Sequence, residues 1–75
     1  MNPDRAAEWM AETVNARGRL AQNEAAMHLM QYRDWRLAYR NDEEQACVGR
    51  WVLRRFRRRY PALRYDRRLK SWRHG

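Results

Sequence analysis

The sequence has little of the chemistry on which enzymes and secreted proteins depend. Cys47 is the only cysteine, so no disulfide forms within the chain, and the three glycines stand singly, which excludes a glycine-rich phosphate loop. His28, His74 and Cys47 lack the spacing of a zinc site, and no general base is placed beside the cysteine by the sequence. We therefore expect neither catalysis nor a metal ion nor a cofactor.

Long apolar runs are also missing. The longest stretch without a charged residue lies between Glu24 and Arg33, far shorter than the roughly 20 apolar residues of a membrane-spanning helix. The N-terminus lacks the basic and then apolar order of a signal peptide. Together with the single cysteine, these features predict a protein of a reducing cytoplasm that does not enter a membrane.

Arginine is what the chain has in excess. Its 75 residues suffice for one domain, residues 1–75, with a small core, and 16 of its 17 basic residues are arginine. Residues 1–45 hold six arginines and eight acidic residues, a net charge of −2, whereas residues 46–75 hold eleven basic residues and one acidic residue, a net charge of +10. A pole of positive charge predicts an anionic partner.

Helix signals in the first half predict two helices. Pro3 suits the first position of a helix that runs to about Arg17. Gly18 is either the C-cap of this helix or an interior glycine of one longer helix, and we expect the helix to end there. A second helix is expected over about residues 19–40, apolar on two sides and therefore central in a bundle. One side, expected to be buried, carries Ala21, Ala25, His28, Tyr32, Trp35 and Tyr39. The other carries Leu20, Met27, Met30 and Leu37, and is either core or an exposed patch for a partner.

A third helix is expected from Asn41 to Tyr60. Asn41 suits an N-cap, three acidic residues follow it in the first turn, and Pro61 cannot continue the helix. The fold class predicted is all-α, a small three-helix bundle with a basic C-terminal segment, residues 62–75. That segment forms either a short fourth helix around residues 66–72 or an extended stretch that orders against a partner.

An acidic stripe of Asp4, Glu8 and Glu12 lines the first helix. Like charges four residues apart are mildly unfavourable on an isolated helix, so a basic neighbour would relieve them. The stripe is either a solvated face, a set of partners for the C-terminal arginines, or a mimic of phosphate toward another molecule.

The basic face of the third helix is the best candidate for a binding site. Trp51 lies there among arginines, a composition that suits stacking on a nucleic-acid base and also the centre of a protein interface, although Trp51 packing on the C-terminal segment is the alternative. Such a surface suits DNA, RNA or an acidic protein. The residues predicted to bind a partner or nucleic acid are Arg50, Trp51, Arg54, Arg55, Arg57, Arg58, Arg64, Arg67, Arg68, Lys70, Trp72 and Arg73.

In size, charge and lack of a catalytic motif, the chain resembles small bacteriophage-encoded proteins that bind and regulate bacterial RNA polymerase. The resemblance implies a non-enzymatic regulator that docks on the transcription machinery in the host cytoplasm and alters transcription. The alternative is a sequence-tolerant DNA- or RNA-binding protein that uses the same basic surface. In either case we expect a monomer rather than a homo-oligomer.

Overall fold

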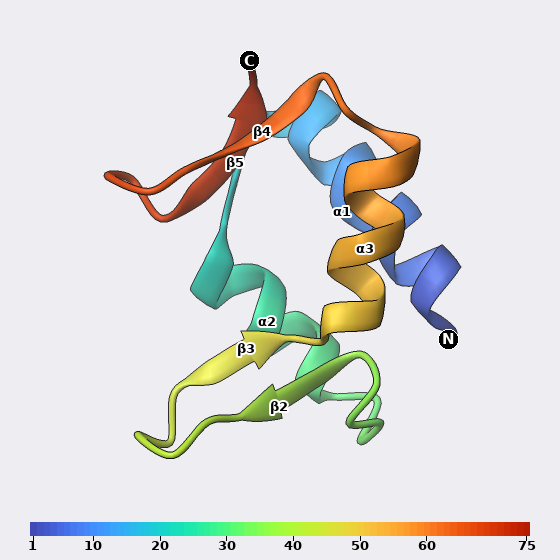
Figure 1. Ribbon diagram of the computed structural model, residues 1–75, viewed down its shortest axis with the longest axis vertical. Coiled ribbons are helices and arrows are strands. Elements are labelled where there is room, and N and C mark those ends of the chain that lie inside the picture. Colours follow the sequence, from blue (N-terminus) through green and yellow to red (C-terminus); the bar gives the residue numbers. More distant parts are fainter.

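The computed structural model describes all residues, 1–75, and contains three helices and five short strands (Figure 1). In chain order the elements are α1 Pro3–Arg17, β1 Arg19–Ala21, α2 Gln22–Met30, β2 Ala38–Arg40, β3 Ala46–Val48, α3 Arg50–Arg59, β4 Leu63–Asp66 and β5 Ser71–His74. The strands form two antiparallel sheets, one of order β1-β5-β4 and one that pairs β2 with β3. The predicted all-α fold is therefore wrong, and the chain mixes helices with sheets.

The first predicted helix is confirmed together with both of its ends. The side chain of Asn2 accepts a hydrogen bond from the Arg5 backbone N–H at 2.8 Å, and Pro3 occupies the first helical position. Gly18 has a φ of +85° and donates its N–H to the Val14 carbonyl, which is the C-cap geometry that glycine adopts most readily. The local signals at each end sufficed because no distant contact opposes them.

The second predicted helix is wrong at both ends. Residues 19–21 form β1, and α2 stops at Met30, after which Asp34 organises a turn by accepting a hydrogen bond from the Arg36 N–H at 2.9 Å. The expected aromatic stripe therefore breaks up, and Trp35 is 71% exposed. Of the residues on the other side, Leu20 and Leu37 are buried, Met30 is half-buried and Met27 is exposed.

The third helix begins eight residues later than expected, with Gly49 and not Asn41 at the N-cap position. Asn41 does use its side chain as an acceptor, but from the Glu43 and Gln45 N–H groups, both at 2.9 Å, within the turn that joins β2 to β3. An Asn that caps a helix and an Asn that closes a turn present the same local signature, so the sequence did not distinguish them. Helix α3 instead starts after Gly49, and its predicted end near Tyr60 is confirmed.

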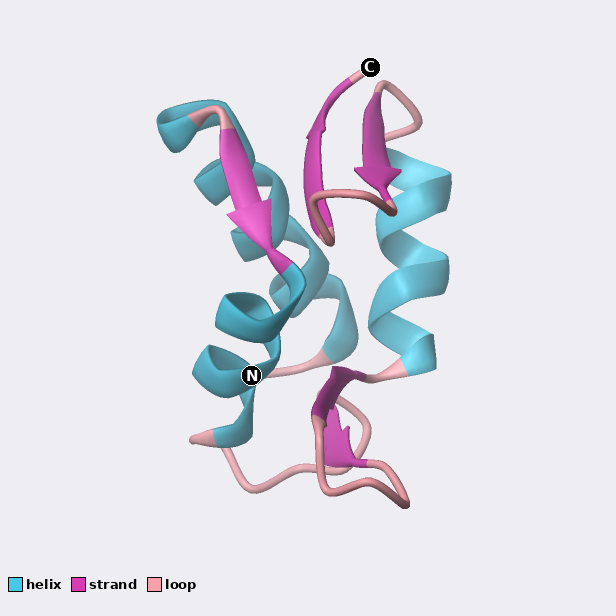
Figure 2. Cartoon of the chain, turned by 90° about the vertical axis from the view of Figure 1, so that its left-hand side faces the viewer, coloured by secondary structure: helices cyan, strands magenta, loops and turns pink.

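The C-terminal segment forms a β-hairpin, and the expectation of a short fourth helix is wrong. Asp66 accepts hydrogen bonds from the N–H groups of Arg68 at 2.9 Å and Leu69 at 3.2 Å, which closes the turn between β4 and β5. Strand β5 then pairs with β1 on its other side, with Leu20 opposite Trp72. Figure 2 shows the β2–β3 hairpin and the strands β4 and β5 toward opposite ends of the molecule, with α3 running between them.

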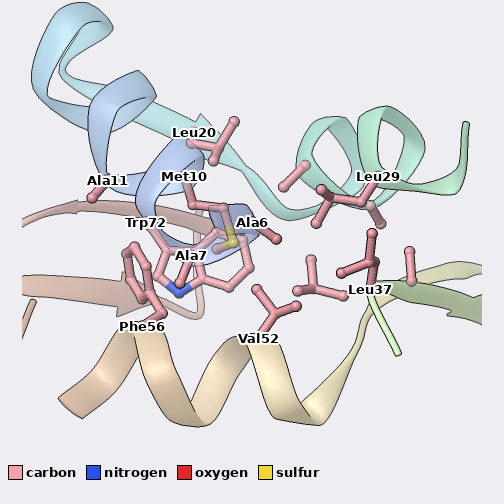
Figure 3. Packing of buried hydrophobic residues seen from close by; sticks show 14 of the residues in the cluster. Ala6, Ala7, Met10, Ala11, Leu20, Leu29, Leu37, Val52, Phe56 and Trp72 are labelled. Carbon is pink, nitrogen blue, oxygen red and sulfur yellow. The ribbon is translucent and has the colours of Figure 1, made fainter. Parts of the chain in front are cut away.

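One hydrophobic core joins all of these elements. Helix α3 packs against α1, whose inward face is rich in alanine and therefore admits a close neighbour. Figure 3 shows Trp72 beside Phe56, and their ring centroids are 5.9 Å apart in an edge-to-face arrangement. None of the helices combines the length and the hydrophobicity that crossing a lipid bilayer requires.

Candidate polyanion-binding surface

Helix α3 separates apolar from basic residues around its axis. Val52 and Phe56 are fully buried against the core, and Leu53 is half-buried. The remaining positions, apart from Trp51, are arginines. At 3.6 residues per turn, a helix of ten residues buries one stripe of side chains, so these arginines lie toward solvent. The exposed or half-buried arginines of α3 are Arg50, Arg54, Arg55, Arg57, Arg58 and Arg59.

Few of the C-terminal basic residues have an acidic partner. Arg55 pairs with Asp4 of α1 at 2.7 Å, and Arg73 pairs with Asp66 at 3.2 Å, and these are the only salt bridges formed by the eleven basic residues of 46–75. The other carboxylates of the acidic stripe, Glu8 and Glu12, both bind Arg5. The stripe thus contributes one carboxylate to α3, and five arginines of that helix have no ionic partner.

The arginines of α3 line an open groove of about 730 Å³. Asp4 is the only acidic residue in its wall, and its charge is already paired with Arg55. Arg57, Arg58 and Arg59 occupy the last turn of α3, where the negative end of the helix dipole stabilises positive charge. The groove therefore concentrates unpaired positive charge, which attracts anions. Salt screens this attraction, so it is strongest at low ionic strength.

Trp51 lies in this groove, and its ring is engaged by its neighbours. The guanidinium carbons of Arg50 and Arg54 lie over the ring at 5.6 and 5.5 Å from its centroid, which are cation–π distances. The side chain is 36% exposed. Trp51 thus orients two arginines toward solvent while it keeps part of its ring available to a partner.

A second basic array crosses the three-stranded sheet. Arg73 of β5 lies opposite Arg19 of β1 on one side and opposite Arg64 of β4 on the other. Residues directly opposite each other in paired strands point to the same face, so the three arginines form a row, and all three are exposed. Asp66 is the one carboxylate beside this row, through its salt bridge with Arg73.

Asp66, the one acidic residue of 46–75, closes the turn between β4 and β5. Its carboxylate accepts backbone hydrogen bonds from Leu69 and Arg68 and a side-chain hydrogen bond from Arg73, and these lower its pKa below the usual value. The turn that it closes presents three basic side chains to solvent, those of Arg67, Arg68 and Lys70.

The structure places most of the predicted site residues on two surfaces. One predicted residue, Trp72, lies in the core instead. Arg50, Trp51, Arg54, Arg55, Arg57 and Arg58 lie on α3, and Arg64, Arg67, Arg68, Lys70 and Arg73 lie on the β4–β5 hairpin. Trp72 is only 6% exposed and belongs to the core, where it contacts Phe56 and Tyr65. Arg19 was not predicted, because it lies in the half of the chain with a negative net charge and joins the row only through strand pairing.

The other reactive residues form no site. Cys47 is half-buried in β3 and has the Gln45 carbonyl as its hydrogen-bond acceptor. His28 stacks on Trp9, with ring centroids 4.1 Å apart, and joins α2 to α1 at the edge of the core. No group of histidine, cysteine and acidic side chains is close enough to hold a metal ion.

Comparison with known proteins gives one match. The model of a family of unknown function, DUF6953, matches residues 2–74, which is nearly the whole chain. No curated protein and no solved structure matches the chain. The match assigns no activity to the chain.

Proposed function

The chain belongs to this family of unknown function, DUF6953, and we propose that it is a nucleic-acid-binding protein that contacts the phosphate backbone through α3 and the β4–β5 hairpin. One observation carries the proposal: of the eleven basic residues in 46–75, nine have no carboxylate partner, and they lie on two adjoining elements. Sequence-independent nucleic-acid binding depends on such arrays, because each neutralised phosphate releases counterions.

The predominance of arginine favours phosphate binding over a general electrostatic role. Its planar guanidinium binds phosphate oxygens through two parallel hydrogen bonds, whereas lysine offers a point charge. The proposed contacts also leave specificity low, since phosphate contacts position a protein and carry no base sequence. The protein therefore binds many sequences with similar affinity.

The salt dependence of binding tests the proposal. Fluorescence anisotropy with a labelled oligonucleotide, measured from about 50 to 200 mM salt, should give a steep slope of log affinity against log salt. The double variant Arg54→Gln/Arg58→Gln should lower that slope by about two, one for each lost phosphate contact. Circular dichroism of the variant should remain that of the wild type, because both side chains are exposed.

A control variant separates site from net charge. Arg17→Gln/Arg36→Gln removes the same charge from residues that already pair with Glu24 and Asp34. We expect its salt slope to equal that of the wild type. Equal losses in both double variants would mean that the overall charge, not the α3 surface, drives binding, and would overturn the assignment.

Docking on an acidic protein surface is the second candidate, and the geometry of Trp51 favours it. Two arginines already cover part of the ring, and a tryptophan with flanking arginines is the composition of protein-interface hot spots. RNA polymerase is the partner that the resemblance implies, for a regulator that alters transcription. A pull-down from bacterial lysate distinguishes the two candidates: a protein retained after nuclease treatment supports docking, and loss of all partners supports direct nucleic-acid binding.

Both candidates place the protein in the cytoplasm. The single cysteine and the exposed arginines are compatible with a reducing compartment that contains nucleic acid. Fractionation of cells that express the tagged chain would test this location.

A further inference from the structure

Three concave regions of the surface share lining residues with one another. The arginine groove of α3 shares Arg57 with a smaller pocket of about 270 Å³, which lies between α3 and the two sheets. That pocket shares Gln22 and Tyr65 with a third groove of about 690 Å³, which reaches the turn between β4 and β5. Figure 1 labels the elements that supply the walls of the middle pocket, among them α3, β2, β3, β4 and β5.

The middle pocket differs from its neighbours in the number of aromatic rings in its wall, which is three against one in each of the others. Tyr39 of β2 and Tyr65 of β4 are 43% and 38% exposed, and Trp72 forms part of the pocket wall. Its volume lies below the roughly 300 Å³ at which pockets for whole small-molecule ligands begin. A flat ring, such as a single base, fits these dimensions and this lining.

Tyr65 is exposed and yet held in place. Its hydroxyl donates a hydrogen bond to the side-chain oxygen of Gln22, and its ring lies 5.0 Å from that of Trp72, its cross-strand partner. A ring that is already immobilised loses little conformational entropy when another ring stacks on it. The pocket thus contains a preorganised stacking surface.

Basic residues stand at both ends of this aromatic pocket. Arg57 lies where it meets the α3 groove, and Arg40, Arg67 and Lys70 line the third groove. Glu44 is the only carboxylate in the walls of these two regions, and the guanidinium of Arg40 binds its backbone carbonyl at 2.8 Å. Aromatic rings between basic residues are the arrangement by which proteins bind single-stranded nucleic acid.

We propose that the pocket between the two sheets binds single-stranded nucleic acid, with one unpaired base stacked against Tyr39 and Tyr65 and the flanking phosphates on Arg57 and the basic rim. This proposal rests on the nucleic-acid-binding function and narrows its substrate class to single strands. A duplex keeps its bases stacked inside and offers none to the tyrosines, so it binds through its phosphates alone.

Anisotropy titrations with labelled oligothymidylate of about 16 nucleotides, and with a duplex of the same length, test the proposal. The wild type should bind the single strand about tenfold more tightly or better. Tyr39→Ala should weaken single-strand binding by about fivefold to a hundredfold, the range for loss of one stacked base, and leave duplex binding unchanged. Trp35→Ala is the matched control, because Trp35 is the most exposed large hydrophobic residue and lines none of the three regions.

The outcomes separate the two proposals. If Tyr39→Ala binds single strands as tightly as Trp35→Ala does, the stacking pocket is wrong although the phosphate-binding function stands. If the wild type binds neither single strand nor duplex at low salt, the proposed function fails and the pocket fails with it. Tyr39→Leu, which keeps an apolar side chain in β2, replaces the alanine variant if circular dichroism shows that Tyr39→Ala is unfolded, and the same affinities then decide.

Discussion

Arg64 and Arg73 lie directly opposite each other on β4 and β5, and Arg19 extends the row across Arg73 onto β1. Like charges opposite each other in paired strands destabilise a sheet. The salt bridge from Asp66 compensates only Arg73. The repulsion between these arginines therefore lowers the free energy of unfolding of the sheet. A bound anion would relieve that repulsion.

Replacing Arg64 with threonine should stabilise the fold and weaken binding. Arg64→Thr removes one like-charge pair and places a residue with high β-propensity in β4, so we expect the free energy of unfolding in urea to rise by about 0.2–1 kcal/mol. Affinity for an oligonucleotide should fall, and the salt slope should drop by about one. A loss of stability would instead show that the Arg64 side chain, which lies beside Gly75, supports the hairpin.

The two tryptophans that the sequence placed in one binding set should behave differently. Trp72→Ala empties part of the core beside Phe56, and such truncations cost about 3–5 kcal/mol, a large part of the stability of a small domain. Trp51→Ala should keep the fold and reduce binding, since the ring orients Arg50 and Arg54. Thermal melts followed by circular dichroism check the first expectation, and anisotropy checks the second.

A side chain at Gly49 should destabilise the fold. A Cβ at this position would lie 2.1 Å from the Arg36 carbonyl oxygen, because the Gly49 N–H donates to Leu37 and brings the two backbone segments together. We expect Gly49→Ala to destabilise the protein by about 1–3 kcal/mol, the usual cost of overpacking. Gly18→Ala is the comparison: its added Cβ meets nothing, and only the positive φ should cost about 1 kcal/mol. Equal urea midpoints for Gly49→Ala and the wild type would contradict this packing.

Asp66 should contribute to stability at neutral pH and lose that contribution in acid. Backbone hydrogen bonds from Leu69 and Arg68 and the contact with Arg73 lower its pKa in the folded state, so the unfolded chain binds more protons near pH 4. The stabilisation is therefore present above about pH 4, the unfolded pKa, and disappears as pH falls through the lower folded pKa. Asp66→Asn keeps an acceptor for the turn but does not titrate.

Urea denaturation of both proteins at about pH 3 and pH 6 provides the measurement. The wild type should lose more stability on acidification than Asp66→Asn does. Glu24 and Asp34, whose pKa values are lowered by Arg17 and Arg36, supply the acid sensitivity that both proteins keep. Identical losses in the two proteins would show that Asp66 does not contribute to the acid sensitivity.

Part of the candidate site was accessible from the sequence. The separation of charge placed nearly all of the predicted basic residues correctly on the surface, because arginines without partners stay in water whatever the fold. The prediction that Trp72 belongs to the binding surface was wrong. The charged residues around it indicate an exposed side chain, and only its strand partners, Leu20 and Tyr65, show that it is buried. The tyrosine pocket was missed for a similar reason: Tyr39 was expected to lie inside a helical bundle.

The sequence by itself determined α1 with its caps, the end of α3 and the positive pole of the chain. These features depend on residues within a few positions of one another, or on composition alone. Only the tertiary structure decided the five strands, because strands of three or four residues carry little periodicity of their own and exist through pairing. Strand β1 meets β5 about fifty residues later in the chain, and that contact buries Trp72, aligns the three arginines and closes the core.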